Sequence, residues 1–379
     1  MHLNNAGAAL SPAPVLNAVL DHLRREAEIG GYEAAAERHG RIEHTYDALA
    51  RLLGCERDEL AVVENATRAW DMAFYAFPFG PGDRILTTRA EYASNYIAMS
   101  QVAGRTGAVV EVVPDDEHGQ VDTRALQSML DERVKLVSLV HVPTQGGLVN
   151  PAAEVGAITR AAGIPLLLDA CQSVGQMPVD VGAIGCDILS ATGRKFLRGP
   201  RGTGFLYVRR ELIERLEPPF LDLHAADWLP GGGYEVRGDA RRFENWESYC
   251  AGRVGLGVAV DYALEWGLEA IRDRVCSLAA LLRERLGAVE GVAVHDLGRE
   301  RCAIVTFSVA GREPEAVARE LSAERVNVSV SPASYSRLDF GPRGLQALVR
   351  ASVHYYNTED ELEQLVELLR TRAGSPSRP

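Results

Sequence analysis

Short apolar runs alternate with amphipathic stretches along the first half of the chain. The runs at residues 60–63, 136–142 and 166–168 are bounded by turn residues and have the length of buried strands. The stretches between them, such as residues 151–162, have the apolar spacing of helices and end at glycine. This alternation predicts an α/β fold with a mostly parallel sheet and right-handed helical crossovers.

The pattern changes after residue 254. A long helical stretch over residues 257–286 is followed by short apolar runs, at 292–295 and 303–307, that alternate with further helical stretches. This order is typical of a smaller α+β domain. We therefore predict an N-terminal segment over residues 1–15 that packs with the small domain, a large domain over 16–250, a small C-terminal domain over 251–372 and a disordered tail over 373–379.

Two of the predicted strands lead into residues of opposite charge. The run at 166–168 continues into Asp169, and the run at 187–190 is soon followed by Lys195. Open α/β sheets bind ligands at the carboxyl ends of their strands. A lysine there can form a Schiff base with pyridoxal 5'-phosphate (PLP), and a carboxylate can keep the pyridine nitrogen protonated so that the ring accepts electrons. Either residue alone is more simply a surface residue, but the pair in this order favours PLP chemistry.

The residues around this pair resemble a known family. The sequence D-A-C-Q-S at residues 169–173, followed by A-T-G-R-K-F-L-R-G-P-R-G-T-G-F-L-Y-V at 191–208, is similar to the class V aminotransferases among the fold-type I PLP enzymes. That family includes cysteine desulfurases, selenocysteine lyases, isopenicillin N epimerase and C–S lyases. The resemblance extends from about Asn4 to the Y-N-T-E-D segment at 356–360. It implies a large domain with a mostly parallel seven-stranded sheet flanked by helices, a smaller α+β domain, and Lys195 and Asp169 as catalytic residues.

The resemblance also implies contacts to the PLP ring. Gln172 would contact the phenolic oxygen, and Thr144 or Gln145 would stand where relatives often carry an asparagine for the same purpose. Desulfurase-type relatives stack a histidine on the pyridine ring, and this chain has none at that place. Tyr92 is the predicted stacking ring, with Tyr96 as the alternative, because an aromatic face can take that position.

A phosphate site is expected where a predicted strand turns into a helix after residue 63. Free N–H groups at a helix start favour anions, although Asn65 or Thr67 could equally be an ordinary N-cap. The resemblance favours the backbone of Ala66 and the hydroxyl of Thr67 as phosphate contacts. It also implies that Thr192 and Arg194 flank the phosphate, where a hydroxyl and a cation suit a dianion.

Further contacts are implied across a dimer interface. Members of the family bring a hydroxyl or an amide from about residue 245 onward to the phosphate of the partner subunit. Asn245, Trp246 and Ser248 are the candidates here, although packing of the tryptophan is the simpler explanation for that residue. The protein is therefore expected to be a homodimer.

A substrate site is predicted late in the chain. Arg350, Ser352 and His354 alternate as in a strand and would share a face. A planar guanidinium there can bind an α-carboxylate with two parallel hydrogen bonds. The resemblance adds Asn5 and Gly7 from the N-terminal segment, so that Arg350, His354, Asn5 and Gly7 are the predicted contacts to an amino-acid substrate.

Composition excludes several other classes of protein. The net charge of −12 argues against a surface for nucleic acid or anionic membrane. No apolar run approaches the roughly 20 residues that span a bilayer, and the N-terminus has no secretory signal pattern. The six cysteines are scattered without a C-x-x-C motif, which supports neither a metal site nor a disulfide framework and fits a reducing cytoplasm.

The reaction is predicted from one missing residue. Cysteine desulfurases of this family carry a nucleophilic cysteine on a loop shortly before the carboxylate arginine, and residues 331–344 contain none. The lysine and arginine motifs resemble those of C–S lyases, so we predict β-elimination from an S-substituted cysteine or its sulfoxide to pyruvate, ammonia and a sulfur product. Transamination, epimerisation and decarboxylating deamination are the alternatives. A non-catalytic scaffold is disfavoured, because it would not need Lys195 together with Asp169 and Arg350.

Overall fold

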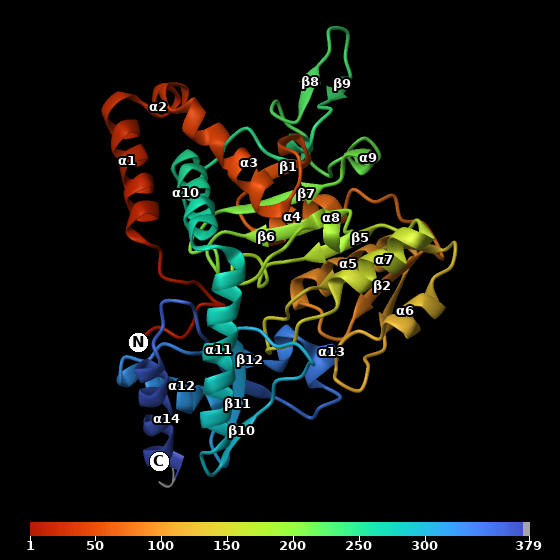
Figure 1. Ribbon diagram of the computed structural model, residues 1–379. Coiled ribbons are helices and arrows are strands. Elements are labelled where there is room, and N and C mark those ends of the chain that lie inside the picture. Colours follow the sequence, from red (N-terminus) through yellow and green to blue (C-terminus); the bar gives the residue numbers. More distant parts are fainter. Residues whose placement is uncertain (374–379) are drawn as a thin grey trace.

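A seven-stranded sheet is the centre of the computed structural model, which describes residues 1–373 (Figure 1). Its strand order is β1-β7-β6-β5-β4-β2-β3, and β7 alone runs antiparallel to its neighbours. The predicted α/β class and the mostly parallel seven-stranded sheet are therefore confirmed. The strands are β1 Leu60–Val63, β2 Arg84–Thr88, β3 Val109–Val113, β4 Val134–Val140, β5 Leu166–Asp169, β6 Ile188–Thr192 and β7 Gly204–Val208.

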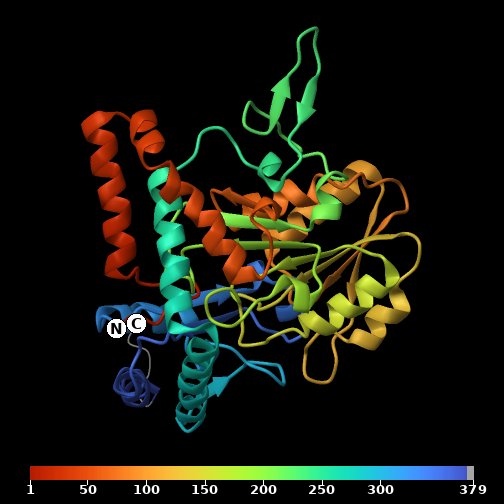
Figure 2. The same ribbon diagram turned by 45° about the horizontal axis from the view of Figure 1, so that its top comes forward.

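Helices cover both faces of this sheet, as Figure 2 shows. Leu167 points into a core that includes α4 and α5, whereas its neighbours Leu166 and Leu168 belong to the opposite core with α3, α7 and α10. Strands buried on both faces need continuous apolar runs, which explains the sequence pattern. These helices are α3 His39–Leu53, α4 Ala66–Phe74, α5 Ala93–Thr106, α7 Ala152–Ala162 and α10 Cys250–Trp266, with shorter helices α6 Thr123–Met129, α8 Val181–Ile184 and α9 Arg210–Ile213.

A second sheet of four antiparallel strands, in the order β10-β11-β13-β12, forms the C-terminal part. The strands are β10 Val292–Val294, β11 Ile304–Val309, β12 Ser329–Pro332 and β13 Ala347–Ser352, and the helices are α11 Leu268–Gly287, α12 Pro314–Ala323, α13 Arg337–Phe340 and α14 Glu359–Ala373. Apart from Ala373, the tail predicted to be disordered lies outside the described residues.

The single helix predicted over residues 257–286 is wrong. The structure has two helices there, because Gly267 separates α10 from α11 with a positive φ of 82°. Apolar spacing continues through both helices and therefore hides the break. The break directs α10 along the large sheet and α11 along the small one (Figure 1).

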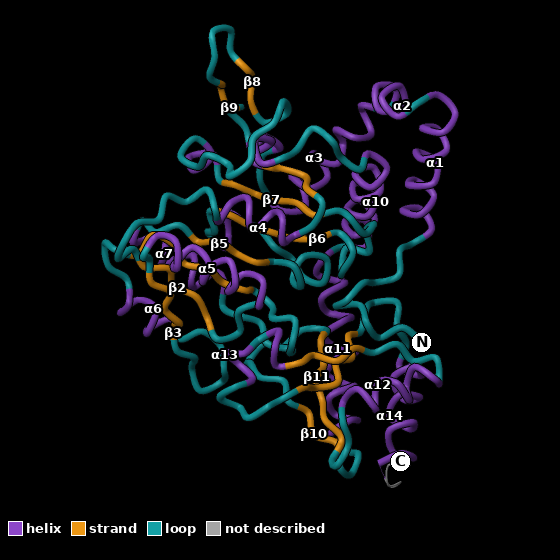
Figure 3. The backbone as a smooth tube through the Cα atoms, turned by 180° about the vertical axis from the view of Figure 1, so that it is seen from behind, coloured by secondary structure: helices purple, strands orange, loops and turns teal. Residues whose placement is uncertain are grey.

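The N-terminal segment crosses to the C-terminal part before the first long helix. His2 pairs with Asn327 and Asn4 pairs with Ser352 through isolated β-bridges. Figure 3 shows the N-terminus beside the small sheet and α12. Helices α1 Ala13–Ile29 and α2 Gly31–Glu37 then lead back to the large sheet.

A hairpin, β8 Ala226–Trp228 and β9 Tyr234–Val236, projects from the large sheet (Figures 1 and 3). Its Trp228 is 81% exposed, and its tip, residues 231–233, consists of three glycines with positive φ. Within residues 1–373, no helix is both long and apolar enough to cross a membrane.

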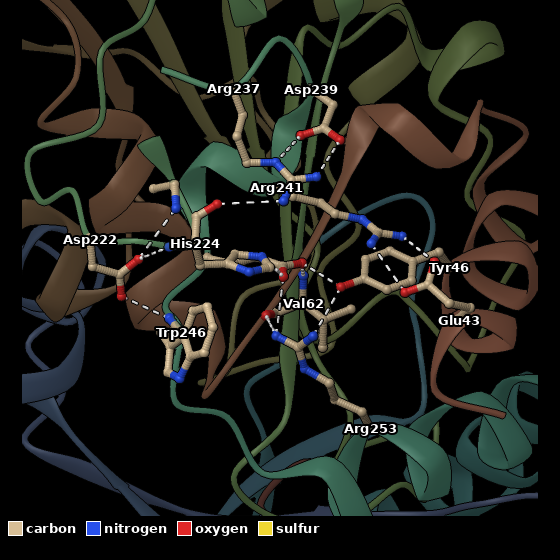
Figure 4. A network of polar contacts seen from close by, with 12 residues as sticks. Glu43, Tyr46, Val62, Asp222, His224, Arg237, Asp239, Arg241, Trp246 and Arg253 are labelled. Carbon is tan, nitrogen blue, oxygen red and sulfur yellow. Dashed lines mark hydrogen bonds and ion pairs between the residues drawn. The ribbon is translucent and has the colours of Figure 1, made fainter. Parts of the chain in front are cut away.

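A buried polar network holds the base of this hairpin to the large sheet (Figure 4). Its centre is the carboxylate of Glu244, which accepts hydrogen bonds from Tyr46 Oη at 2.7 Å, Val62 N at 2.6 Å, His224 Nε2 at 3.0 Å and Arg253 Nη2 at 3.1 Å. The four donors come from separate parts of the chain. Glu244 therefore joins α3, β1, the hairpin segment and α10.

Candidate active site

A cavity of about 440 Å³ opens at the carboxyl ends of β4, β5 and β6, where the sequence pattern predicted a site. Cavities of this size are typical of small-molecule sites. The predicted cofactor contacts line it, apart from the three candidates for a contact across the dimer interface, Asn245, Trp246 and Ser248. The lining consists of Asn65, Ala66, Thr67, Tyr92, Val140, Val142, Thr144, Asp169, Cys171, Gln172, Thr192, Arg194 and Lys195.

Lys195 follows β6 directly and reaches this cavity without a hydrogen bond or ion pair to any residue in the part of the chain that the structure describes. Burial lowers the pKa of its amine, and the nearby Arg194 cation lowers it further. A larger fraction of the amine is therefore neutral than for a surface lysine. A neutral amine is the form that attacks an aldehyde or accepts a proton.

Asp169 ends β5 and is buried beside the cavity. Its Oδ1 accepts from Cys171 N at 2.9 Å, and its Oδ2 accepts from Asn95 Nδ2 at 3.0 Å. Both donors are neutral, and this buried carboxylate forms no ion pair with a cation within residues 1–373. A protonated pyridine nitrogen fits that requirement.

A continuous chain of hydrogen bonds leads from Gln172 and Thr144, which line the cavity, to Arg350. Gln172 Nε2 donates to Thr144 Oγ1 at 3.0 Å, and the same hydroxyl accepts from Arg350 Nη1 at 2.7 Å. Gln172 Oε1 is buried without a donor among the described residues. Such an atom can accept a hydrogen bond from a bound ligand.

Arg350 is the second unmatched charge of the site. It is 7% exposed and donates from Nη1 to the carbonyl of Thr144 at 2.8 Å and from Nη2 to Asn4 Oδ1 at 3.2 Å. Its Nε is buried without an acceptor among the residues described. Burial and the Arg194 cation lower the pKa of Arg350 to about 10. A buried guanidinium with no carboxylate beside it is a binding site for an anion.

The other end of the cavity combines a helix start with Thr192 and Arg194. Asn65 is the N-cap of α4, since its side chain accepts from Arg68 N at 2.9 Å, and Ala66 and Thr67 form the first turn facing the cavity. The N–H groups of a first turn favour a phosphate. Gly204 permits this arrangement, because a Cβ there would lie 2.5 Å from the carbonyl carbon of Asn65.

Thr192 and Arg194 also hold their surroundings in place. Thr192 Oγ1 donates to the carbonyl of Thr203 at 3.2 Å, and Arg194 Nη1 donates to the carbonyl of Gly7 at 2.5 Å. The predicted Gly7 therefore lies next to the site through its backbone. A Cβ on Gly7 would meet Asn4 Oδ1 at 2.7 Å, so a larger residue there would displace the Asn4 side chain, which bonds Arg350.

Two predicted substrate contacts are placed elsewhere. Asn5 is fully buried, with Nδ2 bonded to the carbonyl of Ser352 at 2.7 Å and Oδ1 bonded to the hydroxyl of Tyr356, and its neighbour Asn4 reaches Arg350 instead. His354 lies beyond the end of β13 and is also fully buried.

Both ring nitrogens of His354 are used by the backbone. Nε2 lies 3.1 Å from the carbonyl of Phe196, and Nδ1 accepts from Tyr355 N at 2.9 Å. Burial lowers the pKa of this ring to about 3. The predicted role of His354 in substrate binding is therefore wrong, because the strand that would have aligned it with Arg350 ends at Ser352.

The remaining predictions concern the aromatic residues and the dimer. Tyr92 lines the cavity, whereas Tyr96, on α5, packs against the hydrophobic core. Trp246 is 58% exposed, and neither it nor Ser248 lines the cavity of its own chain. A contact of these two residues to the phosphate of a partner subunit stays a prediction.

Sequence reasoning missed four residues of the site: Asn4, Glu91, Asn95 and Cys171. Glu91 and Asn95 are four residues apart, a spacing at which side chains can meet at a helix start, but nothing local connects them to Asp169. Among the described residues, Lys195 has no partner, Asp169 has no cation and Gln172 Oε1 has no donor, so the site fits a bound PLP.

Comparisons with known proteins agree with this arrangement. The family model described as "Aminotransferase class-V" matches residues 1–365. A probable cysteine desulfurase of Xylella fastidiosa (strain 9a5c) is 32% identical over 386 residues, which cover 97% of this chain and 90% of the relative. The apo structure of a cysteine desulfurase from Thermococcus onnurineus NA1 has a TM-score of 0.91 at 25% identity and covers 98% of this chain and 94% of its own.

A further solved structure shares the fold. It is a complex between the cystine C-S lyase C-DES and its reaction product cysteine persulfide, with a TM-score of 0.87, 22% identity and 97% coverage of both chains. The predicted family and cofactor are confirmed by these comparisons. The chain belongs to the class-V aminotransferase family and is a PLP-dependent enzyme of that family.

Proposed function

We propose that this enzyme is a C–S β-lyase, which converts an S-substituted cysteine or its sulfoxide to pyruvate, ammonia and a sulfur product. The observation that carries the proposal is the cavity itself. Lys195 lines this small space without a hydrogen bond or ion pair among the described residues, and Thr144 of the same lining is bonded to the buried guanidinium of Arg350, whose Nε has no acceptor among them. An α-amino acid carries both groups that these residues suit, an amine for the lysine side of the site and a carboxylate for the guanidinium.

Different residues of the chain would carry out different steps of the reaction. Arg350 would bind the α-carboxylate with the free Nε and a neighbouring nitrogen, and Asn4 and Thr144 hold the guanidinium in place. Lys195 would accept the proton from Cα, since its amine lies in the cavity with a lowered pKa. When bound, PLP withdraws the electron pair left on Cα, and Asp169 balances the charge on the ring nitrogen.

Bond cleavage then follows from the leaving group. The electron pair left by the Cα proton forms the Cα–Cβ double bond, the Cβ–S bond breaks, and the sulfur departs as a thiolate or sulfenate. The enamine product reacts with water to give pyruvate and ammonia. No external oxidant, reductant or keto acid is consumed.

A cysteine desulfurase is the second candidate, because the curated relative carries that name. That reaction needs an enzyme thiol to receive the sulfur. Residues 331–344 hold no cysteine, and Cys171 is the one cysteine among those described that lines the cavity. Burial and the charge of Asp169 raise the pKa of the Cys171 thiol, which disfavours the reactive thiolate.

Product analysis tests the proposal. The holoenzyme is incubated with several cysteine S-conjugates without an α-keto acid, and we expect pyruvate and ammonia in equal amounts. Lys195→Ala should abolish both, whereas Lys135→Ala, which removes an exposed lysine on β4, should not.

Other products would identify the alternatives. Transfer of sulfur to a thiol leaves the amino group on the carbon skeleton, so alanine formed from free cysteine would indicate a desulfurase. Turnover only with an added α-keto acid would indicate an aminotransferase, inversion at Cα an epimerase, and loss of carbon dioxide a decarboxylating deaminase. Binding of PLP without any turnover would support a scaffold.

We also propose that the protein is a cytoplasmic homodimer. Several large apolar side chains around the hairpin are more than half exposed, which supports an interface there. They are Phe220, Leu223, Trp228, Tyr234 and Trp246. Sedimentation should give twice the mass of the chain, and a fully active monomer would contradict this. The six cysteines are unpaired, as expected in a reducing compartment.

A further inference from the structure

A second buried acid lies behind Asp169. The amide nitrogen of Asn95 donates to Asp169 Oδ2 at 3.0 Å and to Glu91 Oε1 at 2.9 Å. Glu91 and Asn95 are only 2% and 3% exposed. One amide group therefore joins the cofactor-facing carboxylate to a carboxyl group that does not line the cavity.

The orientation of Asn95 is determined by these contacts. A carboxylate oxygen accepts hydrogen bonds, so the NH₂ end of the amide must face both acids and supply one hydrogen to each. This arrangement fixes Asp169 Oδ2 from one side, while Cys171 N fixes Oδ1 from the other at 2.9 Å. Two neutral donors therefore hold the Asp169 carboxylate in place before any ligand binds.

Glu91 is anchored by three parts of the large domain. Its Oε1 also accepts from Tyr92 N at 2.8 Å, and its Oε2 accepts from Thr87 Oγ1 on β2 at 2.6 Å and Ser138 Oγ on β4 at 3.2 Å. These donors are all neutral. The charged group that faces Glu91 is Asp169 on β5, and burial together with that charge raises the pKa of Glu91 to about 7.

We propose that Glu91 is a positioning residue for the cofactor: through Asn95 it orients Asp169, and its own charge strengthens the negative potential at the pyridine nitrogen. The two effects can be separated. When Glu91 is protonated at Oε2, that O–H can donate a hydrogen bond to the hydroxyl oxygen of Thr87 or Ser138, and the bond from Asn95 to Oε1 remains. The orientation then persists while the additional charge is lost.

This proposal depends on PLP binding and on the role of Asp169, and it is independent of the C–S lyase reaction. A purely structural role for Glu91 would change the free energy of unfolding without changing the cofactor. A positioning role must appear in the bound cofactor without any substrate. Spectroscopy of the holoenzyme distinguishes the two.

The first test is the pH titration of the visible absorption of bound PLP. Glu91→Gln preserves the hydrogen-bonding shape and removes the charge, so we expect the protonation midpoint of the bound cofactor to move to lower pH by about one unit. Asn95→Leu removes the connection altogether. It should weaken PLP binding about tenfold or more, the effect of losing a hydrogen bond to a charged group.

Asp187→Asn is the matched control. Asp187 is another buried carboxylate of the same sheet, bonded to Leu166 N at 2.8 Å and paired with Arg209 at 2.7 Å, but it lies before β6, at the opposite end from the cavity. Its replacement should lower the melting temperature and leave the midpoint of the cofactor unchanged.

Two results would overturn the proposal. One is a folded Glu91→Gln protein whose cofactor midpoint and PLP affinity equal those of the wild type. The other is a control variant that shifts the midpoint as much as Glu91→Gln does, since the effect would then be general. Failure to release pyruvate would count only against the lyase reaction, because neither measurement includes substrate.

Discussion

Glu244 and Glu91 are both buried in the large domain, yet their pKa values move in opposite directions. Burial alone would raise the pKa of Glu244, but the Arg253 cation, His224, Val62 N and Tyr46 hold it below its usual range. Glu91 is equally buried, but it has neutral donors and the like charge of Asp169, and its pKa rises to about 7.

The difference teaches how to separate structural charges from functional ones in this protein. Around Glu244 each charge has its partner within the chain, and the result is a fixed joint between four parts of the fold (Figure 4). Around the cavity, neither Asp169 nor Arg350 forms an ion pair with any residue that the structure describes. Under the proposed function, the ring nitrogen of the cofactor would supply the charge opposite Asp169 and the substrate carboxylate the charge opposite Arg350.

The largest expected effect is a loss of protein stability when the network around Glu244 is broken. Glu244→Gln should lower the free energy of unfolding by about 3–5 kcal/mol, because it leaves Arg253 buried without its counter-charge. Urea denaturation at pH 8 measures this, with Glu91→Gln as the control. If the two variants lost equal stability at that pH, the contrast between the two glutamates would be contradicted.

Arg350 allows the comparison made for the two buried glutamates to be made for a buried cation. Arg350→Ala should cost about 2–5 kcal/mol in binding of a substrate with a free α-carboxylate, which is tens- to thousands-fold, and little in the stability of the free protein. Affinity for an amino acid and for its amide, measured with both proteins, gives the discrimination. An unchanged ratio between acid and amide would make Arg350 a structural residue.

Asp169→Asn tests the acid end of the cavity. The variant should still bind PLP but lose activity about a hundredfold, roughly 3 kcal/mol, because an amide cannot hold the protonated ring nitrogen by charge. Activity and the absorption of bound PLP are measured together. Activity within a few-fold of the wild type would show that the carboxylate is not needed.

The smallest expected effect is a pH dependence from Glu91. The pKa of Glu91 is raised from 4.5 to about 7 on folding, so the native state binds this proton more tightly and stability falls as pH rises through that window. A complete shift corresponds to about 3 kcal/mol, and relaxation and water penetration reduce our expectation to about 2 kcal/mol.

Denaturation at pH 5 and pH 8 measures this contribution. Relative to wild type, Glu91→Gln should gain stability between the two pH values, since it cannot lose the proton. Glu244→Gln should show no such gain, because the pKa of Glu244 is lowered. A wild-type protein whose pH dependence equals that of Glu91→Gln would contradict the raised pKa.

Much of the site could be predicted because its signals are local. An apolar run predicts a buried strand, and the residue that follows it must lie at the strand end. The order of residues alone therefore puts Asp169 and Lys195 at one edge of the sheet. The sequence motif around Lys195 also predicted the family and its cofactor. These conclusions need only a few consecutive residues at a time.

Tertiary structure decided what depends on distant contacts. Asn95 meets Asp169 across 74 positions, and Asn4 rather than Asn5 meets Arg350 across 346. His354 leaves the face of Arg350 because β13 ends two residues earlier, and Gly267 divides one apolar pattern into two helices. In each case the local pattern permits more than one placement, and contacts with remote segments select one of them.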